Sequence, residues 1–289
     1  MARVLIANPF ASGVTERRLE AVQRALPEGT ETVLTVARGH ATELAREWAS
    51  RAETIYVFSG DGTYNEVLNG VDRDVALGFI PGGGTSVLPR ALGLPRDAVR
   101  AAERVAIGTR RRISLGRVNG RRFGFSAGIG FDAELVRRVD ALGRRQDGKR
   151  PGDVAFAWTV VRTLVDHRLR YEPVLEVEGL GRAAFAFVAN CSPYTYAGGL
   201  GLRFAPDASF EGGLDIVAPV SLRARSLPWL ALQAVRGRSA GKHVLYGHDL
   251  DSAVIHCDMP LPLQVDGEDI GDVEEAVIEA ERDALTVLV

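Results

Sequence analysis

Short apolar runs alternate with amphipathic segments through residues 1–110, and this alternation limits the fold more than any other feature of the sequence. Apolar residues recur at helical spacing within 19–26 and 41–48, as expected for helices that bury one face. The strand-like runs around them occupy residues 4–7, 33–36, 55–58 and 76–80. Strand and helix in alternation predict βαβ units and a largely parallel sheet. We therefore expect an open α/β domain over residues 1–110.

The pattern changes near residue 110. Asn119-Gly120 separates two strand-like segments, 112–118 and 121–126, and Asn-Gly is a strong signal for a type I′ hairpin. More strand-like runs follow at 174–177, 184–189, 214–218, 254–257, 263–265 and 285–289. Helical periods interrupt them at 131–142, 154–169 and 222–235. We therefore expect a second domain over residues 111–289, a β-rich antiparallel sandwich with inserted helices.

Composition excludes several classes of protein. The 289 residues carry 35 Lys and Arg against 37 Asp and Glu, so the chain lacks the strong positive field of a dedicated nucleic-acid binder. Cys191 and Cys257 are its only cysteines, too few for a disulfide framework, and no apolar run is long enough to span a membrane. We therefore expect no nucleic-acid partner and a cytoplasmic location, with any membrane contact peripheral.

Three polar loops follow strands of the predicted parallel sheet. Asn8-Pro9 follows the first strand, Ser59-Gly60-Asp61-Gly62-Thr63 the third, and Gly82-Gly83-Gly84-Thr85 the fourth. Ligands of open α/β sheets bind at the carboxyl ends of the strands. Glycines let a phosphate approach backbone N–H groups, and the Asp61 carboxylate could hold a Mg²⁺-nucleotide or ribose hydroxyls. A plain βα turn explains one such loop equally well, but three at one sheet edge favour a phosphate site.

Several segments, in their order and spacing, resemble the diacylglycerol kinase catalytic domain family, which includes diacylglycerol, sphingosine and YegS-like lipid kinases. Beside the three loops, the similarity extends through Asn65-Glu66-Val67-Leu68-Asn69-Gly70, Gly128-Ile129-Gly130-Phe131-Asp132-Ala133, Ala205-Pro206-Asp207, Glu211-Gly212-Gly213-Leu214-Asp215 and Asp266-Gly267-Glu268. It therefore covers nearly the whole chain. The resemblance implies a first domain that binds nucleotide and a second that completes the active site.

The resemblance also assigns roles to residues. It implies that ATP is contacted by Asn8, Gly60, Asp61, Gly62, Thr63, Gly84 and Thr85. Asp266 would be the general base, with Glu268 beside it, and Asp61 would be a second catalytic residue, required for turnover. Mg²⁺ would bind near Glu211 and Asp215. The implied reaction transfers the γ-phosphate of ATP to the hydroxyl of a diacylglycerol-like or sphingoid lipid. Without the resemblance, Asp266-Gly267 indicates a hairpin turn, and the acids at 211 and 215 indicate solvated loop residues.

Three departures from the family pattern bear on the site. Ser59 replaces the usual first glycine, as it does in sphingosine kinases. The segment 86–89 after Thr85 is one residue shorter than usual and lacks the customary asparagine, which affects nucleotide contacts. Glu211 stands where the family generally carries aspartate, which affects the geometry of the metal site.

Three other functions remain open at this stage. One is a kinase of the related NAD kinase type, and another is a nucleotide-binding module without catalysis. The third is a serine hydrolase, because Gly124-Phe125-Ser126-Ala127-Gly128 matches a nucleophile elbow. His243, His248 and His256 could supply its base. An elbow serine requires a parallel central strand, however, whereas the Asn119-Gly120 hairpin predicts an antiparallel one.

The expected partners are ATP and a lipid, with an anionic membrane surface and a second copy of the chain as further candidates. The membrane candidate is a cluster of basic residues beside the apolar helical period 154–164. Its members are Arg137, Arg138, Arg144, Arg145, Lys149 and Arg150. A solvated basic loop followed by a core helix explains the same pattern.

Overall fold

The computed structural model describes residues 2–142, 159–160, 162–163, 165–166, 170–197, 199–237 and 241–289. These residues form two compact units. Unit 1 comprises Met1–Ser114 and Asp283–Val289, and unit 2 comprises Leu115–Arg282. Most of the predicted helix 154–169 lies outside the described residues, as do Arg144, Arg145, Lys149 and Arg150. The expected domains, 1–110 and 111–289, differ from these units because the last residues of the chain return to unit 1.

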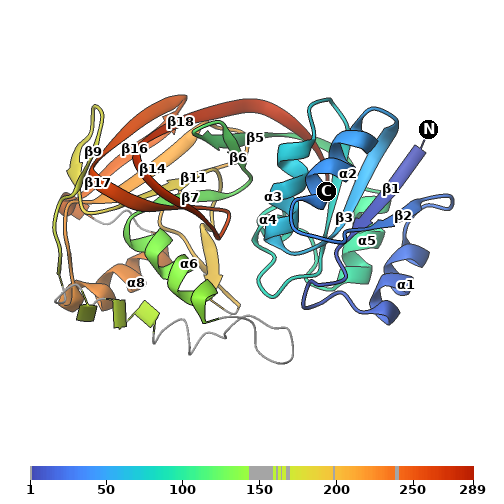
Figure 1. The fold of residues 1–289 in the computed structure, drawn as a ribbon, viewed down its shortest axis with the longest axis horizontal. Coiled ribbons are helices and arrows are strands. Elements are labelled where there is room, and N and C mark those ends of the chain that lie inside the picture. The colour runs from blue at the N-terminus through green and yellow to red at the C-terminus, as the bar shows by residue number, and fades with distance from the viewer. Residues whose placement is uncertain are drawn as a thin grey trace. The chain divides into compact units, whose positions relative to one another are not determined.

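Unit 1 is built on parallel strands in the order β2-β1-β3-β4 (Figure 1). The end of β18, a long C-terminal strand, adds to this sheet beside β4, where Val287 pairs with Leu77. Helix α1 packs against α5, and α2 packs against α3. The elements are β1 Ala2–Ala7, α1 Glu16–Ala25, β2 Glu31–Leu34, α2 His40–Ala49, β3 Ala52–Ser59, α3 Asp61–Gly70, β4 Ala76–Pro81, α4 Val87–Ala91 and α5 Ala98–Ala106.

Burial on both faces explains why the strands of unit 1 are visible in the sequence. Every residue of β4 is buried, as are the last six of β3 and the last four of β1. Such strands are continuous apolar runs, without alternating polar residues. Side-chain caps begin two of the helices, since Thr15 accepts a hydrogen bond from the Arg18 N–H and Asp97 accepts one from the Arg100 N–H.

The direction of winding of the sheet reverses at the carboxyl ends of β1 and β3. The chain leaves β1 toward β2 on one side and leaves β3 toward β4 on the other, so the direction of winding reverses between these neighbours. Ligands of open α/β sheets bind at such a reversal. The loops that begin at Asn8 and Gly60 start at this point of the sheet.

Unit 2 is dominated by antiparallel strands, which run in the order β16-β14-β11-β7-β17-β18. The elements are β5 Arg110–Val118, β6 Arg121–Phe123, β7 Ser126–Ile129, α6 Phe131–Ala141, β8 Arg170–Tyr171, β9 Leu175–Val177, β10 Gly181–Ala183, β11 Ala186–Ala189, β12 Thr195–Ala197, β13 Leu200–Leu202, β14 Leu214–Pro219, β15 Leu222–Arg223, α8 Leu227–Arg236, β16 Val244–Leu250, β17 Ser252–Val265 and β18 Glu268–Leu288. Strands β5 and β18 continue from one unit into the other.

Strand β17 contributes to two parts of unit 2. It pairs with β9 at residues 255–257 and with β7 at residues 263–265, and its pairing with β18 shifts register between His256 and Leu261. Side chains from β9 and β10 share one apolar core with side chains from β7, β11 and β14. The predicted fold class, an α/β domain followed by a β-rich sandwich, is confirmed.

The hairpin predicted at Asn119-Gly120 is confirmed. Strands β5 and β6 pair antiparallel on either side of it, and Asn119 and Gly120 have φ values of 48° and 83°, as a type I′ turn requires. The helix predicted at 222–235 begins later, because residues 222–223 form β15 and pair with β8. Among the described residues, none of the helices combines the length and the hydropathy that a membrane span requires.

Candidate active site

Hydrogen bonds join the three polar loops of unit 1 at the carboxyl edge of its sheet. The Asn8 N–H donates to the Phe58 carbonyl at 3.2 Å, and the Gly13 N–H donates to the Gly82 carbonyl at 2.8 Å. The Gly82 N–H in turn donates to the Ser59 carbonyl at 2.6 Å. The structure therefore brings together the loops after β1, β3 and β4 that the sequence singled out.

Two glycines allow the second and third loops to touch. A Cβ on Gly83 would lie 2.8 Å from the Cα of Gly60, and a Cβ on Gly60 would lie 3.3 Å from the Cα of Gly83. The first distance is shorter than real Cβ contacts, and its partner is backbone that cannot rotate away. The absence of a side chain at Gly83 is therefore a requirement of the loop packing.

Ser59, the departure from the family's first glycine, is part of a buried hydroxyl network. Its Oγ donates to Thr63 Oγ1 at 2.8 Å, and Asn8 Nδ2 donates to the same Thr63 oxygen at 2.9 Å. Asn8 Oδ1 also accepts the Phe10 N–H at 2.9 Å. The side chains of Asn8 and Thr63 thus fix the first loop to the start of α3, and the serine hydroxyl stabilises that contact.

Asp61 is the first residue of α3, at the positive end of the helix dipole. Its half-buried carboxylate accepts the Leu88 N–H at 3.3 Å, at the start of α4. The shortened segment after Thr85 is ordered here: Ser86 adopts a left-handed conformation with φ of 48°, and its Oγ accepts the Gly83 N–H at 3.2 Å. The shortened segment therefore leads into α4, where Asp61 accepts a backbone N–H.

Tyr64 is a residue of this site that sequence reasoning missed. Its ring is buried, and its hydroxyl oxygen lies 2.6 Å from the Ser59 carbonyl and 2.7 Å from the Ile80 carbonyl. Burial, together with the nearby Asp61, raises the pKa of Tyr64 well above its usual value, so the hydroxyl stays protonated and donates. The side chain therefore ties the end of β3 to the end of β4.

A pocket of about 140 Å³ lies beside the third loop, and its charged lining was also missed. Gly13 and residues 81–86 line it, together with Arg18, Arg90, Arg96 and one acidic residue, Asp97. Arg18 donates to the Gly13 carbonyl at 3.2 Å and Arg90 to the Thr85 carbonyl at 3.4 Å. Guanidinium forks and glycine-loop amides together suit a polyphosphate. The only lysines of the chain are Lys149 and Lys242, and the basic residues that line this pocket are all arginines.

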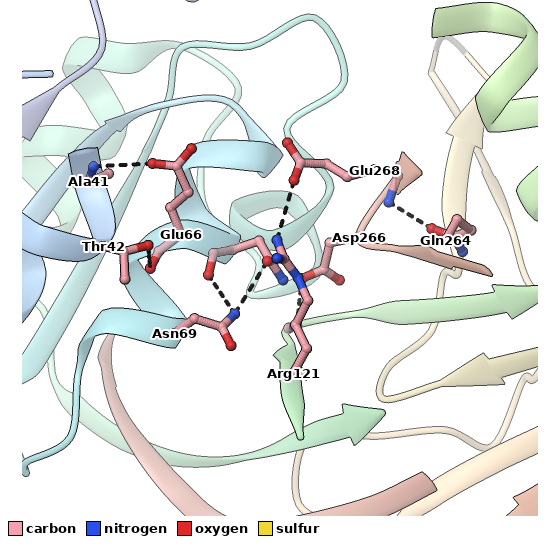
Figure 2. A network of polar contacts seen from close by, with 11 residues as sticks. Ala41, Thr42, Glu66, Asn69, Arg121, Gln264, Asp266 and Glu268 are labelled. Atoms are coloured by element: carbon pink, nitrogen blue, oxygen red, sulfur yellow. Dashed lines mark hydrogen bonds and ion pairs between the residues drawn. The ribbon is translucent and has the colours of Figure 1, made fainter. Parts of the chain in front are cut away.

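The remaining polar residues of α3 stabilise the packing of helices. Figure 2 shows Glu66 Oε2 accepting the Ala41 N–H at 3.1 Å, while the Glu66 carbonyl accepts the Thr42 hydroxyl at 2.9 Å. Asn69 Nδ2 donates to the Asn65 carbonyl at 2.8 Å. Glu66 thus satisfies a backbone N–H at the start of α2, where an acceptor is otherwise missing.

In unit 2, Asp266 occupies the tight turn between β17 and β18. Its φ is 49° and that of Gly267 is 78°, and Asp266 is 3% exposed. The Gly124 N–H donates to its Oδ2 at 2.7 Å, and the Phe125 and Ser126 N–H groups donate to its Oδ1 at 2.9 and 3.1 Å. Asp266 is therefore both a hairpin residue and a carboxylate held in one fixed orientation by backbone donors.

Glu268, two residues further on, lies 3.4 Å from an Arg121 nitrogen (Figure 2). The Gly267 N–H donates to Gln264 Oε1 at 2.8 Å. Gln264 Nε2 continues to Asp132 Oδ2 at 2.8 Å, and Tyr194 donates to that oxygen at 2.6 Å. Burial raises the pKa of Asp132 while these two donors lower it. A buried polar network thus supports the turn.

The acidic segment predicted to bind metal lies in unit 2, where Glu211 and Asp215 line one pocket. Asp215 is 1% exposed. Its Oδ1 accepts from His248 Nδ1 at 2.9 Å and the Asp249 N–H at 3.1 Å, and its Oδ2 accepts the Tyr246 hydroxyl at 2.6 Å. Across the described ranges, no group of three or more His, Cys, Asp or Glu could hold a metal ion. Magnesium in phosphoryl-transfer sites is held by one or two carboxylates together with water and phosphate oxygens, so the metal assignment of this pair stays a prediction.

Ser126, the candidate nucleophile of a hydrolase, lies in β7. This strand pairs antiparallel with both β11 and β17, whereas a nucleophile elbow follows a parallel strand. The Ser126 N–H donates to Asp266. His256, one of the candidate bases, pairs with Glu178 and Glu275. The antiparallel topology around Ser126 therefore does not fit a serine hydrolase.

Comparison with known proteins agrees with these features. The sequence profile named diacylglycerol kinase catalytic domain matches residues 2–118. A diacylglycerol kinase of Bacillus subtilis (strain 168) is 31% identical over 246 residues, which are 83% of this chain and 79% of that protein. A diacylglycerol kinase of Staphylococcus carnosus is 35% identical over 127 residues, which are 41% of this chain and 42% of that protein.

Solved structures show the same fold. The crystal structure of a diacylglycerol kinase from Bacillus anthracis superposes with a TM-score of 0.72 at 20% identity, covering 99% of this chain and 96% of that one. The similarity to the Bacillus subtilis enzyme extends over most of both sequences. The resemblance drawn from the glycine loops and the Asp-Gly-Glu segment is confirmed: the chain belongs to the diacylglycerol kinase family and is a kinase.

Proposed function

We propose that this kinase transfers the γ-phosphate of ATP to the hydroxyl of a diacylglycerol-like lipid. The use of a nucleotide is supported by one observation: three polar loops, two of them glycine-rich, are joined at one sheet edge, beside a pocket lined by three arginines. The choice of a lipid as the acceptor rests on the family and on the names of the relatives. A sphingoid acceptor remains the alternative, since Ser59 is shared with sphingosine kinases.

In this proposal unit 1 holds the nucleotide, supplied as its Mg²⁺ complex. Backbone amides of the Gly60-Asp61-Gly62-Thr63 and Gly84-Thr85 loops, with the side chain of Asn8, would position the phosphates. Arg18, Arg90 and Arg96 would neutralise the charge of the chain of phosphates. Asp61, which sits at a helix N-terminus, would orient the charged end of the nucleotide. Phosphoryl transfer relies chiefly on such positioning and charge stabilisation.

Asp266 would act as the general base, with Glu268 beside it. As the lipid oxygen bonds to the γ-phosphorus, the bond from that phosphorus to the bridging oxygen breaks and ADP leaves with the electron pair. The proton of the lipid hydroxyl passes to the Asp266 carboxylate and then to solvent. Three backbone donors fix that carboxylate before the substrate arrives, so no reorientation is needed during the reaction.

An acceptor panel tests the proposed function. The purified chain is incubated with MgATP and, separately, with diacylglycerol, sphingosine, ceramide or NAD, and both ADP and the phosphorylated product are measured. We expect product with diacylglycerol. Phosphorylation of NAD alone would indicate a nucleotide acceptor, and ATP binding without any product would indicate a non-catalytic module. Either outcome overturns the proposal.

A further inference from the structure

Helix α8 of unit 2 has one face in the protein core and one exposed apolar face. Leu230 packs against the aromatic cluster of the unit, and Ala234, one turn later, is buried. Trp229 and Leu232 face outward and are 48% and 43% exposed. Exposed Trp and Leu on one helical face are unusual for a water-exposed surface, because contact with water raises the free energy of apolar side chains. By contrast Trp48, in unit 1, is buried.

The exposed apolar pair lies within a helical stripe that ends in arginine on both sides. Arg225 lies four residues before Trp229, in the turn that leads into α8, and Arg236 lies four residues after Leu232. Residues four apart on an α-helix share a face, as Leu232 and Arg236 do, whereas Arg225 lies in the 3-10 turn before the helix. Both arginines are exposed. Among the described residues, neither forms an ion pair. The stripe therefore combines an apolar centre with uncompensated positive ends.

The charge of the surrounding sequence is entirely positive. From residue 216 to residue 248 the sequence contains no Asp or Glu, although the whole chain has slightly more acidic than basic residues. The basic residues of this stretch are Arg223, Arg225, Arg236, Arg238 and Lys242. Such local segregation of charge favours contact with an extended anionic surface.

Strand β13 extends the same region. It packs beside α8, and the Arg203 N–H at its end donates to the Ala234 carbonyl at 2.7 Å. Leu200 on β13 is 49% exposed, and Arg203 is exposed as well. We name Leu200, Arg225, Trp229, Leu232 and Arg236 the α8 surface.

The basic residues that the sequence first suggested differ from the α8 surface. Arg137 is held by Asp269 and Asp272, and Arg138 by Glu134 and Asp166. Their charge is therefore neutralised within the protein. An anionic surface would have to displace those carboxylates before it could gain from these arginines.

We propose that the α8 surface docks the protein onto an anionic phospholipid bilayer. Trp229 and Leu232 would enter the boundary between headgroups and acyl chains, and Arg225 and Arg236 would contact lipid phosphates. A bilayer fits this surface because it offers apolar and anionic contacts together. The reason for docking rests on the proposed lipid kinase activity, since docking brings the enzyme to a substrate that does not leave the membrane. The docking itself does not depend on that activity.

Vesicle flotation tests the apolar part of the proposal. The chain is mixed with phosphatidylcholine vesicles that contain or lack phosphatidylglycerol, without ATP. We expect wild type to float only with the anionic vesicles, and Trp229→Ala/Leu232→Ala to bind at least about tenfold more weakly. Ile107→Ala is the matched control, because Ile107 is an exposed aliphatic residue of unit 1. Equal binding by the double variant and wild type would refute the docking role.

Charge reversal tests the electrostatic part. Arg225→Glu/Arg236→Glu should bind anionic vesicles at least about tenfold more weakly, and its residual binding should depend less on salt. Arg46→Glu, on an exposed position of α2, is the matched control and should bind like wild type. Circular dichroism and Tm confirm that each variant folds. Vesicle binding that ignores phosphatidylglycerol, or variants that alter self-association and leave vesicle binding intact, would overturn the proposal.

The docking proposal and the kinase proposal can be rejected independently of each other. Vesicle binding is measured without catalysis, so a chain that docks through α8 but phosphorylates no lipid would reject only the kinase proposal. A short-chain diacylglycerol that dissolves as monomers tests the kinase proposal without a membrane, and therefore independently of docking. We expect the α8 variants to keep wild-type turnover with this substrate and to lose turnover with vesicle-borne diacylglycerol. Equal turnover of the vesicle-borne substrate would reject docking and leave the kinase proposal standing.

Discussion

Asp61 in unit 1 and Asp266 in unit 2 both precede a glycine, yet the two units give the same dipeptide different surroundings. Asp61 begins a helix, is half-buried, and accepts the Leu88 N–H at 3.3 Å. Asp266 lies in a left-handed turn, is buried, and accepts three backbone N–H groups at 2.7–3.1 Å. The first carboxylate lies at the positive end of a helix dipole, whereas the second is held in one orientation by three backbone donors.

This difference indicates a division of work between the units. A half-exposed carboxylate at a helix N-terminus, beside glycine amides and arginines, suits a site that binds a charged ligand. A carboxylate fixed by backbone donors suits a group that must meet a reacting proton in one geometry. The comparison therefore predicts that substitutions in unit 1 weaken ATP binding first, and that substitution of Asp266 lowers turnover first.

The largest effect is expected for Asp266→Asn. Asparagine tolerates the left-handed backbone, but it has no basic oxygen to accept the substrate proton, so kcat should fall by about 10³-fold. Its amide nitrogen would also face one backbone N–H, which should cost about 1–3 kcal/mol of stability. Steady-state kinetics and Tm measure the two effects. A kcat near wild type in a folded variant would remove Asp266 from the base role.

Asp61→Asn should have the next largest effect. Asparagine retains an oxygen for the Leu88 N–H, so Tm should stay near wild type, while the loss of charge should raise the KM for ATP about tenfold or more. Comparing KM and kcat in this variant with those in Asp266→Asn tests the division of work directly. The same kinetic pattern in both variants would contradict it.

Gly83→Ala tests the contact between the glycine loops. The added Cβ would meet the Gly60 Cα at 2.8 Å, so the loops must separate, and the affinity for ATP should fall several-fold, by about 1 kcal/mol. At Gly84 a Cβ meets no atom within 4 Å. Loss of binding in Gly84→Ala would therefore report contact with the nucleotide itself. ATP affinity is measured by calorimetry for both variants.

Tyr64→Phe should lower stability more than it lowers activity. It removes a buried hydroxyl that lies against the Ser59 and Ile80 carbonyls, so we expect a loss of about 1–2 kcal/mol. Denaturant unfolding measures this change. An unchanged midpoint would show that the tie between β3 and β4 contributes nothing to stability.

The smallest effect is expected at His248 of unit 2, whose pKa is raised by its hydrogen bond with Asp215. A raised pKa in the folded state stabilises the protein fully below the unfolded-state pKa of histidine, about 6.5. This contribution is lost as the pH rises through the folded-state pKa. Because the side chain is more than half exposed, we expect under about 1 kcal/mol. The Tm difference between wild type and His248→Gln should shrink as the pH rises, and a constant difference would contradict this.

Much of unit 1 could be predicted from its sequence. Its strands are buried on both faces, so each is an apolar run that stands out against its surroundings. The first part of β18 could not be predicted in this way, because exposed acids such as Glu274 and Glu275 interrupt it. Only its buried end, the apolar run predicted at 285–289, was visible. Strand β16 was missed for a similar reason, since it has only one fully buried residue.

The site divides in the same way. Glycine loops carry a local signal, because their residues lie next to one another in the sequence. Tyr64, Arg18 and Arg96 gain their roles only through contacts formed by folding, which no short motif displays. Asp266 is an intermediate case: the sequence predicts its turn, but its three donors come from residues 124–126, far away in the chain.

We propose that unit 1 binds ATP and that Asp266 enables transfer of its γ-phosphate to a lipid hydroxyl. The most direct measurement follows a radiolabelled γ-phosphate from ATP into diacylglycerol in mixed micelles, with wild type and Asp266→Asn compared at saturating ATP. We expect labelled lipid phosphomonoester with wild type and almost none with the variant, although the variant still binds ATP. Label released only as inorganic phosphate, or equal transfer by both proteins, would contradict it.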